Sequence, residues 1–482
     1  MKGDIKLILK SVRQYKVPAL LTPVFMMFEA CIEMLLPFFM SQMVTYMEAH
    51  PLDLSLSDPG LYKYFIILGC LVVVSITCGF LGGVTAAKAS TGFAKNLRED
   101  LYKKIETFSF ANIDKFSTSS LVTRLTTDVQ NCQQSFQMCT RILIRAPLMF
   151  IFSIVMGFIT GGAVAWVFVV IVPFIVVAAL IIVRIVVPTF RKLFKRYDKL
   201  NESVEENVSG IRVVKSFVRE EYEQTKFNTA SDSLAKDFIR IEKVVALTNP
   251  ILNTFVHISN FGVILLGCYF IAKTASLAAD DPAKFNVGQI SALLTYGISC
   301  LMSLLMVAVI LLMLVMSIES ARRIGEVLRE VPTIANPENP VYEVKNGTIE
   351  FNDVSFKYKE EASEYSVRDL NLKIKSGEFI GIIGSTGSGK TSIVNLISRL
   401  YDVSKGTLTV GDVDVKDYDL KTLRDNVSVV LQKNLLFSGT IEDNLRWGNQ
   451  NATKEEIWKA CDIAQASEFI KGFKDGLDTK IS

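Results

Sequence analysis

The sequence predicts a multidomain protein, in which an all-α transmembrane domain of six helices precedes an α/β domain. Two observations predict this architecture. Half of the 482 residues are hydrophobic and only 21% are charged, and the long apolar runs lie in the first two thirds of the chain. The last third instead alternates strand-like and helical patterns. This composition excludes a disordered chain, a disulfide-stapled secreted module and a collagen-like repeat.

Six segments are long and apolar enough to cross a membrane, which takes about 20 residues. The third and fourth are separated by little more than Gly161 and Gly162, which indicates a tight hairpin. The first is too long for a cleaved signal peptide, and it contains Glu29 and Glu33. We assign residues 1–328 to a transmembrane domain with helices near 17–44, 62–87, 142–160, 163–187, 244–271 and 287–318.

The distribution of charge indicates how these helices are oriented. The N-terminal stretch and the two long loops, near 88–141 and 188–243, are rich in Lys and Arg and should face the cytoplasm. The short connections near 45–61 and 272–286 carry acidic residues and few bases, so we expect them to lie outside. The long loops contain few Gly or Pro, so we expect the membrane helices to continue as long cytoplasmic helical extensions. The sequence therefore predicts a multi-pass protein of the cell membrane, with its N-terminus and its α/β domain in the cytoplasm.

Glu29 and Glu33 lie one helical turn apart within the first apolar segment. A carboxylate at the bilayer centre costs on the order of 2.5–3.5 kcal/mol on insertion scales, so the pair should face a water-filled cavity or protein rather than lipid. One interpretation is a site for a cationic or polar substrate, and the commoner alternative is hydrogen bonding between helices or a water-filled outer cleft. Arg184, near the cytoplasmic end of the fourth segment, is expected to extend its charge toward the interface.

Several classes of function are excluded by what the chain contains. The net charge of +3 and the lack of a basic tract give no reason to expect a nucleic-acid partner. The 8 cysteines form no C-x-x-C pair, and we expect them to be small buried hydrophobic residues. With only 2 histidines, His50 and His257, a histidine-ligated metal centre or a Ser-His-Asp hydrolase is not expected.

After a linker at residues 329–346, the sequence places a glycine-rich loop between a strand and a helix. Residues 347–358 alternate like a strand, and 370–384 predict two more strands with Gly377 at their turn. The last strand runs into GSTGSGKT at 384–391, followed by the helical pattern SIVNLISRL, which is the G-x-x-x-x-G-K-[ST] motif in its required context.

This motif has the residues that phosphate binding requires. Small residues let backbone N–H groups point at phosphate, and the following helix adds its positive end. Lys390 should contact the β- and γ-phosphates, and the Thr391 hydroxyl should ligate Mg²⁺. The predicted binding residues are Gly384, Ser385, Thr386, Gly387, Ser388, Gly389, Lys390, Thr391 and Ser392.

Together with this loop, other segments carry a resemblance to a known family. They are VSFKY ending at Tyr358, VVLQKNLLFSGTIEDNL at 429–445, ANIDKFSTSSLVTRLTTDV at 111–129, NESVEENVSGIRVVKSFVREE at 201–221 and SARRIGEVL at 320–328. Over essentially its whole length the chain resembles a half-transporter of the ATP-binding-cassette (ABC) exporters. It is most similar to the bacterial multidrug type, which often works as a heterodimer.

The resemblance implies roles for particular residues. Residues 347–482 would be the N-terminal part of an α/β P-loop nucleotide-binding domain, with ATP and Mg²⁺ as cofactors. Tyr358 would stack on adenine, and Gln432 would lie beside Mg²⁺ and the attacking water as a metal ligand and catalytic residue. The stretches near 109–117 and 202–211 would contact nucleotide-binding domains, the second reaching across to the partner subunit.

The resemblance also implies a function. The chain would be one subunit of a dimer, with a heterodimer favoured over a homodimer, that contacts membrane lipid and exports small amphipathic or drug-like substrates by alternating access. Export of peptides or lipids, or a nucleotide-gated channel or sensor, are alternatives.

One departure from the family limits this expectation. No LSGGQ signature, acidic Walker B strand or switch histidine occurs in the 482 residues. We therefore expect the chain to be a truncated product or a part of a longer protein. By itself it should bind nucleotide weakly without hydrolysing it. Whether this subunit's site is catalytic or degenerate stays open, because the deciding glutamate is in the missing strand.

Overall fold

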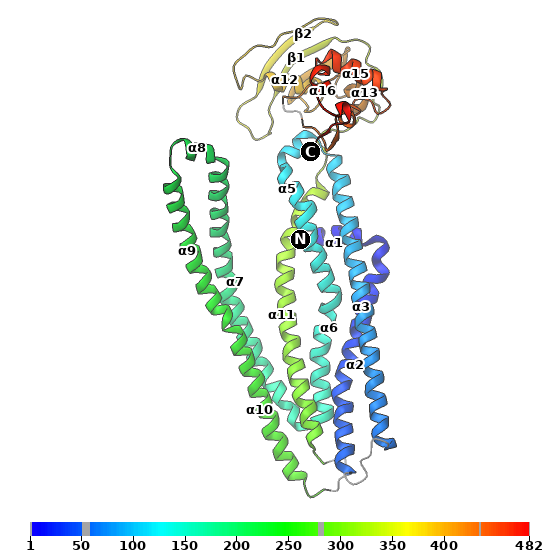
Figure 1. Cartoon of the computed structure of the whole chain (residues 1–482), viewed down its shortest axis with the longest axis vertical. Coiled ribbons are helices and arrows are strands. Elements are labelled where there is room, and N and C mark those ends of the chain that lie inside the picture. The colour runs from blue at the N-terminus through cyan, green and yellow to red at the C-terminus, as the bar shows by residue number, and fades with distance from the viewer. Residues whose placement is uncertain (1, 51–57, 278–283, 433–434, 482) are drawn as a thin grey trace. The chain divides into compact units, whose positions relative to one another are not determined.

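The computed structural model describes residues 2–50, 58–277, 284–432 and 435–481. They divide into two compact units (Figure 1). The membrane unit contains Met1–Thr107 and Phe116–Glu330, and the soluble unit contains Phe108–Lys115 and Val331–Ser482. The short segment Phe108–Lys115 thus belongs with the C-terminal third of the chain, although it lies between two membrane helices in sequence.

The described residues of the membrane unit form helices joined by short turns and loops, with no strand among them. Its long helices are α2 (Lys16–Ala49), α3 (Pro59–Glu106), α6 (Val129–Gly161), α7 (Trp166–Ser209), α9 (Glu220–Ala246), α10 (Thr248–Thr274) and α11 (Val287–Arg329). Shorter helices are α1 (Lys2–Leu9), α5 (Thr118–Thr123) and α8 (Ile211–Ser216). The predicted helical extensions are confirmed, since α3 and α7 continue far past their apolar segments.

Among the described residues, five helical stretches are long and apolar enough to cross a membrane. One of them, Thr118–Ala178, contains both α6 and the start of α7, so the five stretches overlap all six predicted segments and contain three of them in full. The hairpin between α6 and α7 is the 3-10 turn Gly162–Ala165, where Gly162 has a φ of 48°. The fifth predicted segment is interrupted at Leu247, between α9 and α10.

The N-terminus of α11 is fixed by local hydrogen bonds. Asn286 caps the helix by accepting from the Gln289 backbone N–H at 2.9 Å, and the Gln289 side chain accepts from the Asn286 N–H at 3.0 Å. The Asn286 amide also donates to Thr45 at 2.7 Å. This capping box therefore both starts α11 and joins it to α2.

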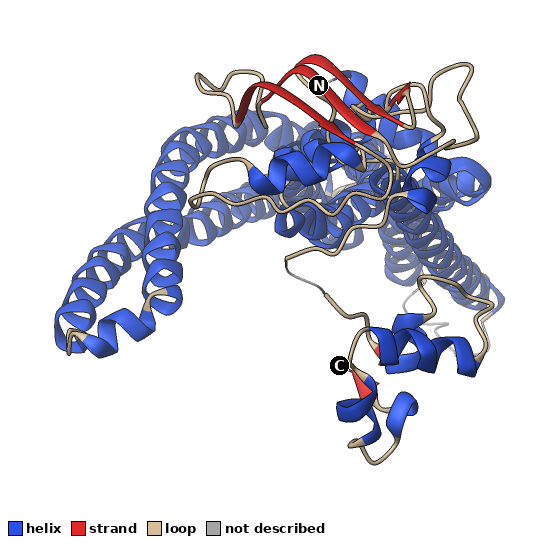
Figure 2. Cartoon of the chain, turned by 90° about the horizontal axis from the view of Figure 1, so that it is seen from above, coloured by secondary structure: helices blue, strands red, loops and turns tan. Residues whose placement is uncertain are grey.

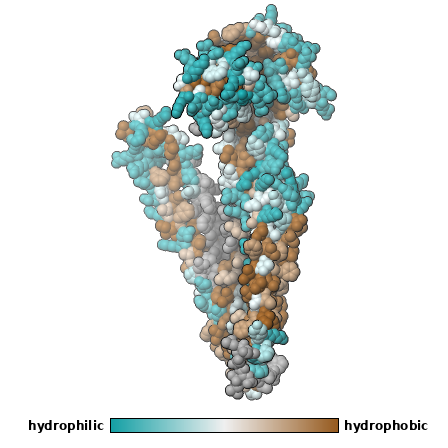
Figure 3. Space-filling model, turned by 45° about the vertical axis from the view of Figure 1, so that its right-hand side comes forward, coloured by the Kyte–Doolittle hydropathy of each residue, from teal (hydrophilic) through white to brown (hydrophobic). Residues whose placement is uncertain are grey.

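The core of the membrane unit lies where α2, α6, α7, α10 and α11 meet. Its buried residues include Met34, Phe168, Val263 and Tyr296, and the Tyr296 hydroxyl donates to the Met34 carbonyl at 3.0 Å. Other apolar side chains point outward, so that hydrophobic residues gather along the helices in Figure 3. On a chain of this composition such a surface meets lipid. The protein is therefore a multi-pass membrane protein.

The cysteines differ in part from the prediction. All 8 are free, but only Cys132, Cys300 and Cys461 are buried. Cys70 and Cys268 are exposed on α3 and α10. A free cysteine behaves as a small hydrophobic side chain, so an apolar lipid environment suits it as well as a protein core does.

The soluble unit is built on an antiparallel sheet of order β2-β1-β3-β4, whose strands lie side by side in Figure 2. They are β1 (Ile349–Phe356), β2 (Val367–Ile374), β3 (Lys405–Val410) and β4 (Val413–Asp414). Phe351 at the centre of β1 pairs with Leu372 of β2 and Leu408 of β3. The core of the soluble unit also contains residues of α12 (Lys390–Ile397) and α13 (Leu420–Asn426).

A second small core in this unit contains α15 (Lys454–Ile463) and α16 (Ser467–Lys471). The helix α14 (Ile441–Leu445) follows the short strand β5 (Gly439–Thr440), which pairs with β6 (Lys480–Ile481).

One predicted strand is wrong. Gly377 does turn the chain, with a φ of 84°, but residues 378–384 form no strand. Phe379 and Ile383 are 101% and 98% exposed. A strand exists only when its N–H and C=O groups pair with a neighbour, and none of the described strands pairs with this segment.

Candidate nucleotide-binding site

Backbone geometry explains the glycines of the loop at 384–391. The loop leads directly into α12, which begins at Lys390. Gly387 and Gly389 have φ values of 85° and 89°, a region that other residues enter only at a cost. At Gly389 a Cβ would also lie 2.5 Å from the Ser366 carbonyl oxygen. The position therefore accepts glycine alone.

The Lys390 side chain folds back over this loop. Its Nζ donates to the carbonyl oxygens of Gly384 and Ser385 at 2.8 and 2.7 Å, and lies 3.5 Å from Ser388 Oγ. Residues 384–388 of the loop are exposed. A cation held beside the amino-terminal end of a helix, next to exposed backbone N–H groups, suits a phosphate.

The next two residues of α12 have different surroundings. Thr391 is exposed, so its hydroxyl can reach a metal ion bound with the phosphates. Ser392 is 5% exposed, and its Oγ lies 2.9 Å from the Tyr358 hydroxyl oxygen. Tyr358 is thereby attached to the helix that follows the phosphate loop.

The Tyr358 ring lies just beyond the end of β1 and is 43% exposed. It makes an edge contact with Phe356, with the centroids 4.8 Å apart. A ring with this much exposed surface can still be covered by a planar base. The structure therefore brings Tyr358, the glycine-rich loop and Ser392 together.

Gln432 is not brought to this group. It is exposed in a bend directly before residues 433–434, which are outside the described part of the chain. No hydrogen bond among the described residues joins it to the phosphate loop. Its role as metal ligand and catalytic residue stays a prediction.

In the membrane unit, Glu29 and Glu33 of α2 share one cation, Arg145 of α6. Arg145 Nη2 donates to Glu33 Oε2 at 2.7 Å, and Nη1 lies 3.8 Å from Glu29 Oε2. The Glu29 Oε2 atom is buried and has no hydrogen-bond partner. Two carboxylates with one guanidinium leave an excess of one negative charge. We call these three residues the Glu–Arg–Glu triad.

Sequence reasoning missed Arg145. The available signal was an arginine inside the third apolar segment, where a charge needs a partner. The sequence could not show which helix supplies that partner.

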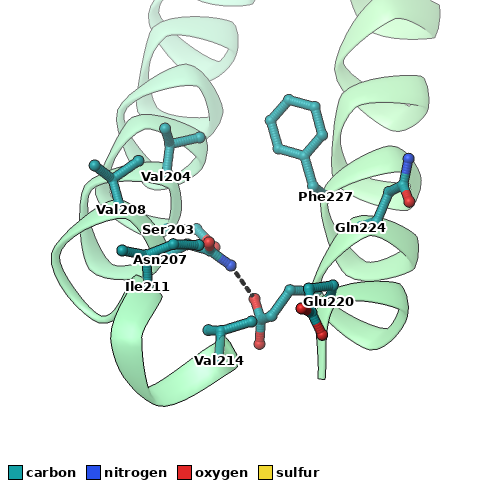
Figure 4. Close-up of a pocket in the computed structure, with 10 residues that line it drawn as sticks. Ser203, Val204, Asn207, Val208, Ile211, Val214, Glu220, Gln224 and Phe227 are labelled. Atoms are coloured by element: carbon teal, nitrogen blue, oxygen red, sulfur yellow. Dashed lines mark hydrogen bonds between the residues drawn. The ribbon is translucent and has the colours of Figure 1, made fainter. Parts of the chain in front are cut away.

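A cavity of about 420 Å³ lies between the ends of α7 and α9, beside α8 (Figure 4). Apolar side chains such as Val204, Val208 and Phe227 face it, and Asn207 donates to Glu223 at 2.9 Å. The cavity contains none of the residues that the sequence singled out for nucleotide or metal binding.

Comparison with known proteins decides the family. Residues 20–304 match the ABC transporter transmembrane region, and residues 367–478 match the ABC transporter domain. The chain belongs to the ABC transporter family. Its organisation, apolar helices followed by the nucleotide-binding domain, is that of an ABC exporter half-transporter.

Relatives of this ABC transporter include proteins named only by family and one named by function. An uncharacterised ABC transporter ATP-binding protein of Mycobacterium tuberculosis is 33% identical over 421 residues, which are 86% of this chain and 70% of that protein. A Bacillus subtilis protein of the same description is 32% identical over 409 residues, 85% of this chain and 70% of its own length. The ATP-dependent lipid A-core flippase of Desulfotalea psychrophila is 25% identical over 504 residues, 100% of this chain and 81% of the flippase.

Membership of the ABC transporter family identifies ATP as the ligand of the glycine-rich loop. The ABC transporter domain binds ATP, and the family couples ATP hydrolysis to transport. The residues present fit ATP, because the loop, Lys390 and the Tyr358 ring offer a phosphate cradle and an aromatic face along one helix.

Proposed function

We propose that this ABC half-transporter is one subunit of a dimeric exporter, which moves amphipathic or drug-like molecules out of the cell by alternating access. The observation that carries the proposal is that Lys390 of α12 donates to the phosphate loop and Ser392 of α12 contacts Tyr358, in a chain whose other unit contains helices of membrane length. Residues 1–328 would form the transmembrane domain, 329–346 the linker and 347–482 nucleotide-binding structure. The N-terminus and the nucleotide-binding domain would be cytoplasmic, as the basic loops suggest.

Within this proposal the chain's own residues bind and orient ATP. The loop N–H groups and Lys390 hold the phosphates, and Tyr358 stacks on adenine. Thr391 and Gln432 would hold Mg²⁺, which neutralises phosphate charge when it is bound. ATP drives the transporter only by binding one conformation of the dimer better than the other.

Exposed apolar residues support the need for a partner subunit. At the turn between α8 and α9, Phe217 and Val218 are 73% and 81% exposed, and Val213 of α8 is 60% exposed. This turn is part of a cytoplasmic extension rather than of a lipid-facing segment, so its apolar surface suits protein. We favour a heterodimer over a homodimer on the resemblance to the multidrug type.

The Glu–Arg–Glu triad supports a cationic substrate. Its excess negative charge, and the Glu29 Oε2 atom that accepts no hydrogen bond, would be satisfied by a protonated amine on an otherwise apolar molecule. Glu29 and Glu33 are accordingly our candidates for substrate-binding residues.

The test is ATP-dependent uptake of a cationic dye into inside-out membrane vesicles that contain the intact transporter. We expect accumulation against the gradient, and at least a tenfold loss with Lys390→Ala. Lys373→Ala is the matched control, because Lys373 is an exposed lysine of the same unit, paired with Glu350 at 3.2 Å. Uptake that runs only downhill, or that survives Lys390→Ala, would support a channel or sensor instead.

A second candidate is lipid export, because one relative over the full length of this chain is a lipid flippase. Movement of a fluorescent phospholipid between leaflets of reconstituted vesicles tests it. ATP-dependent movement of the lipid without uptake of the dye would favour this candidate.

A further inference from the structure

The helix α4 (Phe110–Phe116) packs into the soluble unit through its residues up to Lys115. Asn112 is 1% exposed, its Nδ2 donates to the Val331 carbonyl at 3.1 Å, and its Oδ1 accepts from the Thr333 N–H at 3.2 Å. Ala111 packs against the core that contains β1 and α12. This part of the first cytoplasmic loop is thus a built-in piece of the unit that holds the phosphate loop.

Tyr401 is the residue through which α4 meets the nucleotide side of this unit. It lies between α12 and β3 and is 8% exposed. Its hydroxyl donates to Asp114 Oδ2 at 2.7 Å, and its ring lies 6.0 Å from that of Phe110. Both of these partners belong to α4.

Besides α4, Tyr401 contacts the ring of Tyr358. The two centroids are 5.1 Å apart and the ring planes are at 86°, an edge-to-face pair. The Tyr358 hydroxyl oxygen lies 2.9 Å from Ser392 Oγ of α12. A continuous series of contacts therefore runs from α12 through Tyr358 and Tyr401 to Asp114.

The phenol of Tyr401 stays protonated. Its burial, and then the Asp114 carboxylate, raise its pKa far above the ordinary value. The hydroxyl is therefore a donor to Asp114 at every physiological pH, and the bond to a charged acceptor is a strong one.

We propose that Tyr401 is a positioning residue that couples occupancy of the adenine side of the nucleotide site to the placement of α4. Tyr401 does not touch the nucleotide itself, and it acts through Tyr358 on one side and Asp114 on the other. The inference rests on the proposed role of Tyr358 as the adenine-stacking ring.

The physical basis is the rotational freedom of two rings. A base stacked on Tyr358 restricts that ring, and the edge-to-face contact then restricts Tyr401 and keeps its hydroxyl on Asp114. Coupling of this kind is reciprocal, so weakening the bond to Asp114 must weaken the response of α4 to nucleotide. Spatial continuity alone does not establish such coupling, and a pair of variants is needed to measure it.

The experiment is hydrogen exchange of the α4 backbone amides, measured in the intact transporter with and without a non-hydrolysable ATP analogue. The informative variants are Tyr401→Phe, which keeps the ring, and Asp114→Asn, whose exposed side chain makes a folding defect avoidable. Tyr418→Phe is the matched control. It removes a phenolic hydrogen bond of 2.8 Å to the Val410 carbonyl in the same core, away from α4.

We expect the ATP analogue to slow exchange in α4 at least fivefold in the parent protein and in Tyr418→Phe. The effect should fall to less than twofold in Tyr401→Phe, in Asp114→Asn and in the double variant, with no further loss when the two are combined. Inorganic tripolyphosphate, which fills the phosphate loop but lacks a base, should give the smaller effect in the parent protein.

Equal protection of α4 in the parent protein and in Tyr401→Phe would overturn the inference. So would equal protection by tripolyphosphate and the ATP analogue, which would place the coupling at the phosphates. Binding of a fluorescent ATP analogue, measured alongside, separates this failure from failure of the proposed function. Binding insensitive to Lys390→Ala defeats the proposed function, whereas Lys390-dependent binding with unchanged α4 exchange defeats only the inference.

Discussion

Glu29 of α2 lies directly against Gly79 of α3. A Cβ on Gly79 would be 2.8 Å from Glu29 Oε1 and 3.3 Å from its Cδ. The missing side chain at Gly79 thus leaves the space that the carboxylate occupies, and through Glu29 it affects the whole Glu–Arg–Glu triad.

Gly79→Ala should therefore change recognition of cations without changing the fold. The new methyl group displaces the Glu29 carboxylate from its position near Arg145, so we expect KM for uptake of a monocationic dye to rise at least threefold. Gly83→Ala, one turn further along α3, is the matched control, because a Cβ there meets nothing within 4 Å. Equal KM values for the two variants would remove Glu29 from the substrate site.

Arg145→Leu should destabilise the membrane unit. The substitution leaves the carboxylates of Glu29 and Glu33, whose side chains are 17% and 40% exposed, without their shared cation. Removing one partner of a buried ion pair costs about 3–5 kcal/mol, and the partial exposure of Glu33 puts our expectation near 3 kcal/mol. Thermal unfolding in detergent measures it. Adding Glu33→Gln should recover part of the loss, and no recovery would mean that the guanidinium stabilises by packing instead.

The features predicted correctly from the sequence are those that a local pattern of residues determines. Six apolar segments predict the membrane helices, because each helix that crosses the bilayer must by itself be long and apolar enough to do so. The phosphate loop is recognisable because its glycines and Lys390 are contiguous. The helical continuation of α3 to Glu106 also follows from composition alone.

Contacts between residues far apart in the sequence could not be predicted from local patterns. Arg145 lies 112 residues from its partner Glu33, and only the packing of α6 on α2 joins them. The link from Tyr401 to Asp114, 287 residues apart, is of the same kind. Residues 378–384 show the converse, since an apolar alternating pattern predicts a strand whether or not a neighbour is there to pair with it.

Gly389→Ala should abolish high-affinity ATP binding. The alanine would have to adopt a φ of 89°, which costs about 1–2 kcal/mol, and its methyl group would also meet the Ser366 carbonyl at 2.5 Å. Gly387→Ala is the matched control, because its φ is 85° but a Cβ there meets nothing within 4 Å. Titration with a fluorescent ATP analogue should show at most about a thirtyfold loss for Gly387→Ala, since 2 kcal/mol at 1.4 kcal/mol per factor of ten is about that much, and a larger loss for Gly389→Ala. Similar losses would show that the loop moves away from Ser366.

Arg322 and Arg323, neighbours near the end of α11, should differ sharply in their effect on stability. Arg323 Nη2 donates at 2.5 Å to Asp128, which is fully buried at the base of α6. Arg322 is an exposed residue paired with Glu319 and Glu326 on its own helix.

Arg323→Leu leaves the buried Asp128 carboxylate without its cation, so we expect a loss of about 3 kcal/mol in the free energy of unfolding. Arg322→Leu should cost less than about 1 kcal/mol, because exposed pairs contribute little. Asp128→Asn in the Arg323→Leu background should recover much of the loss, since it removes the stranded charge. Equal unfolding temperatures for the two single variants would show that water reaches Asp128 once Arg323 is gone, and that the ion pair does not hold α11 against α6.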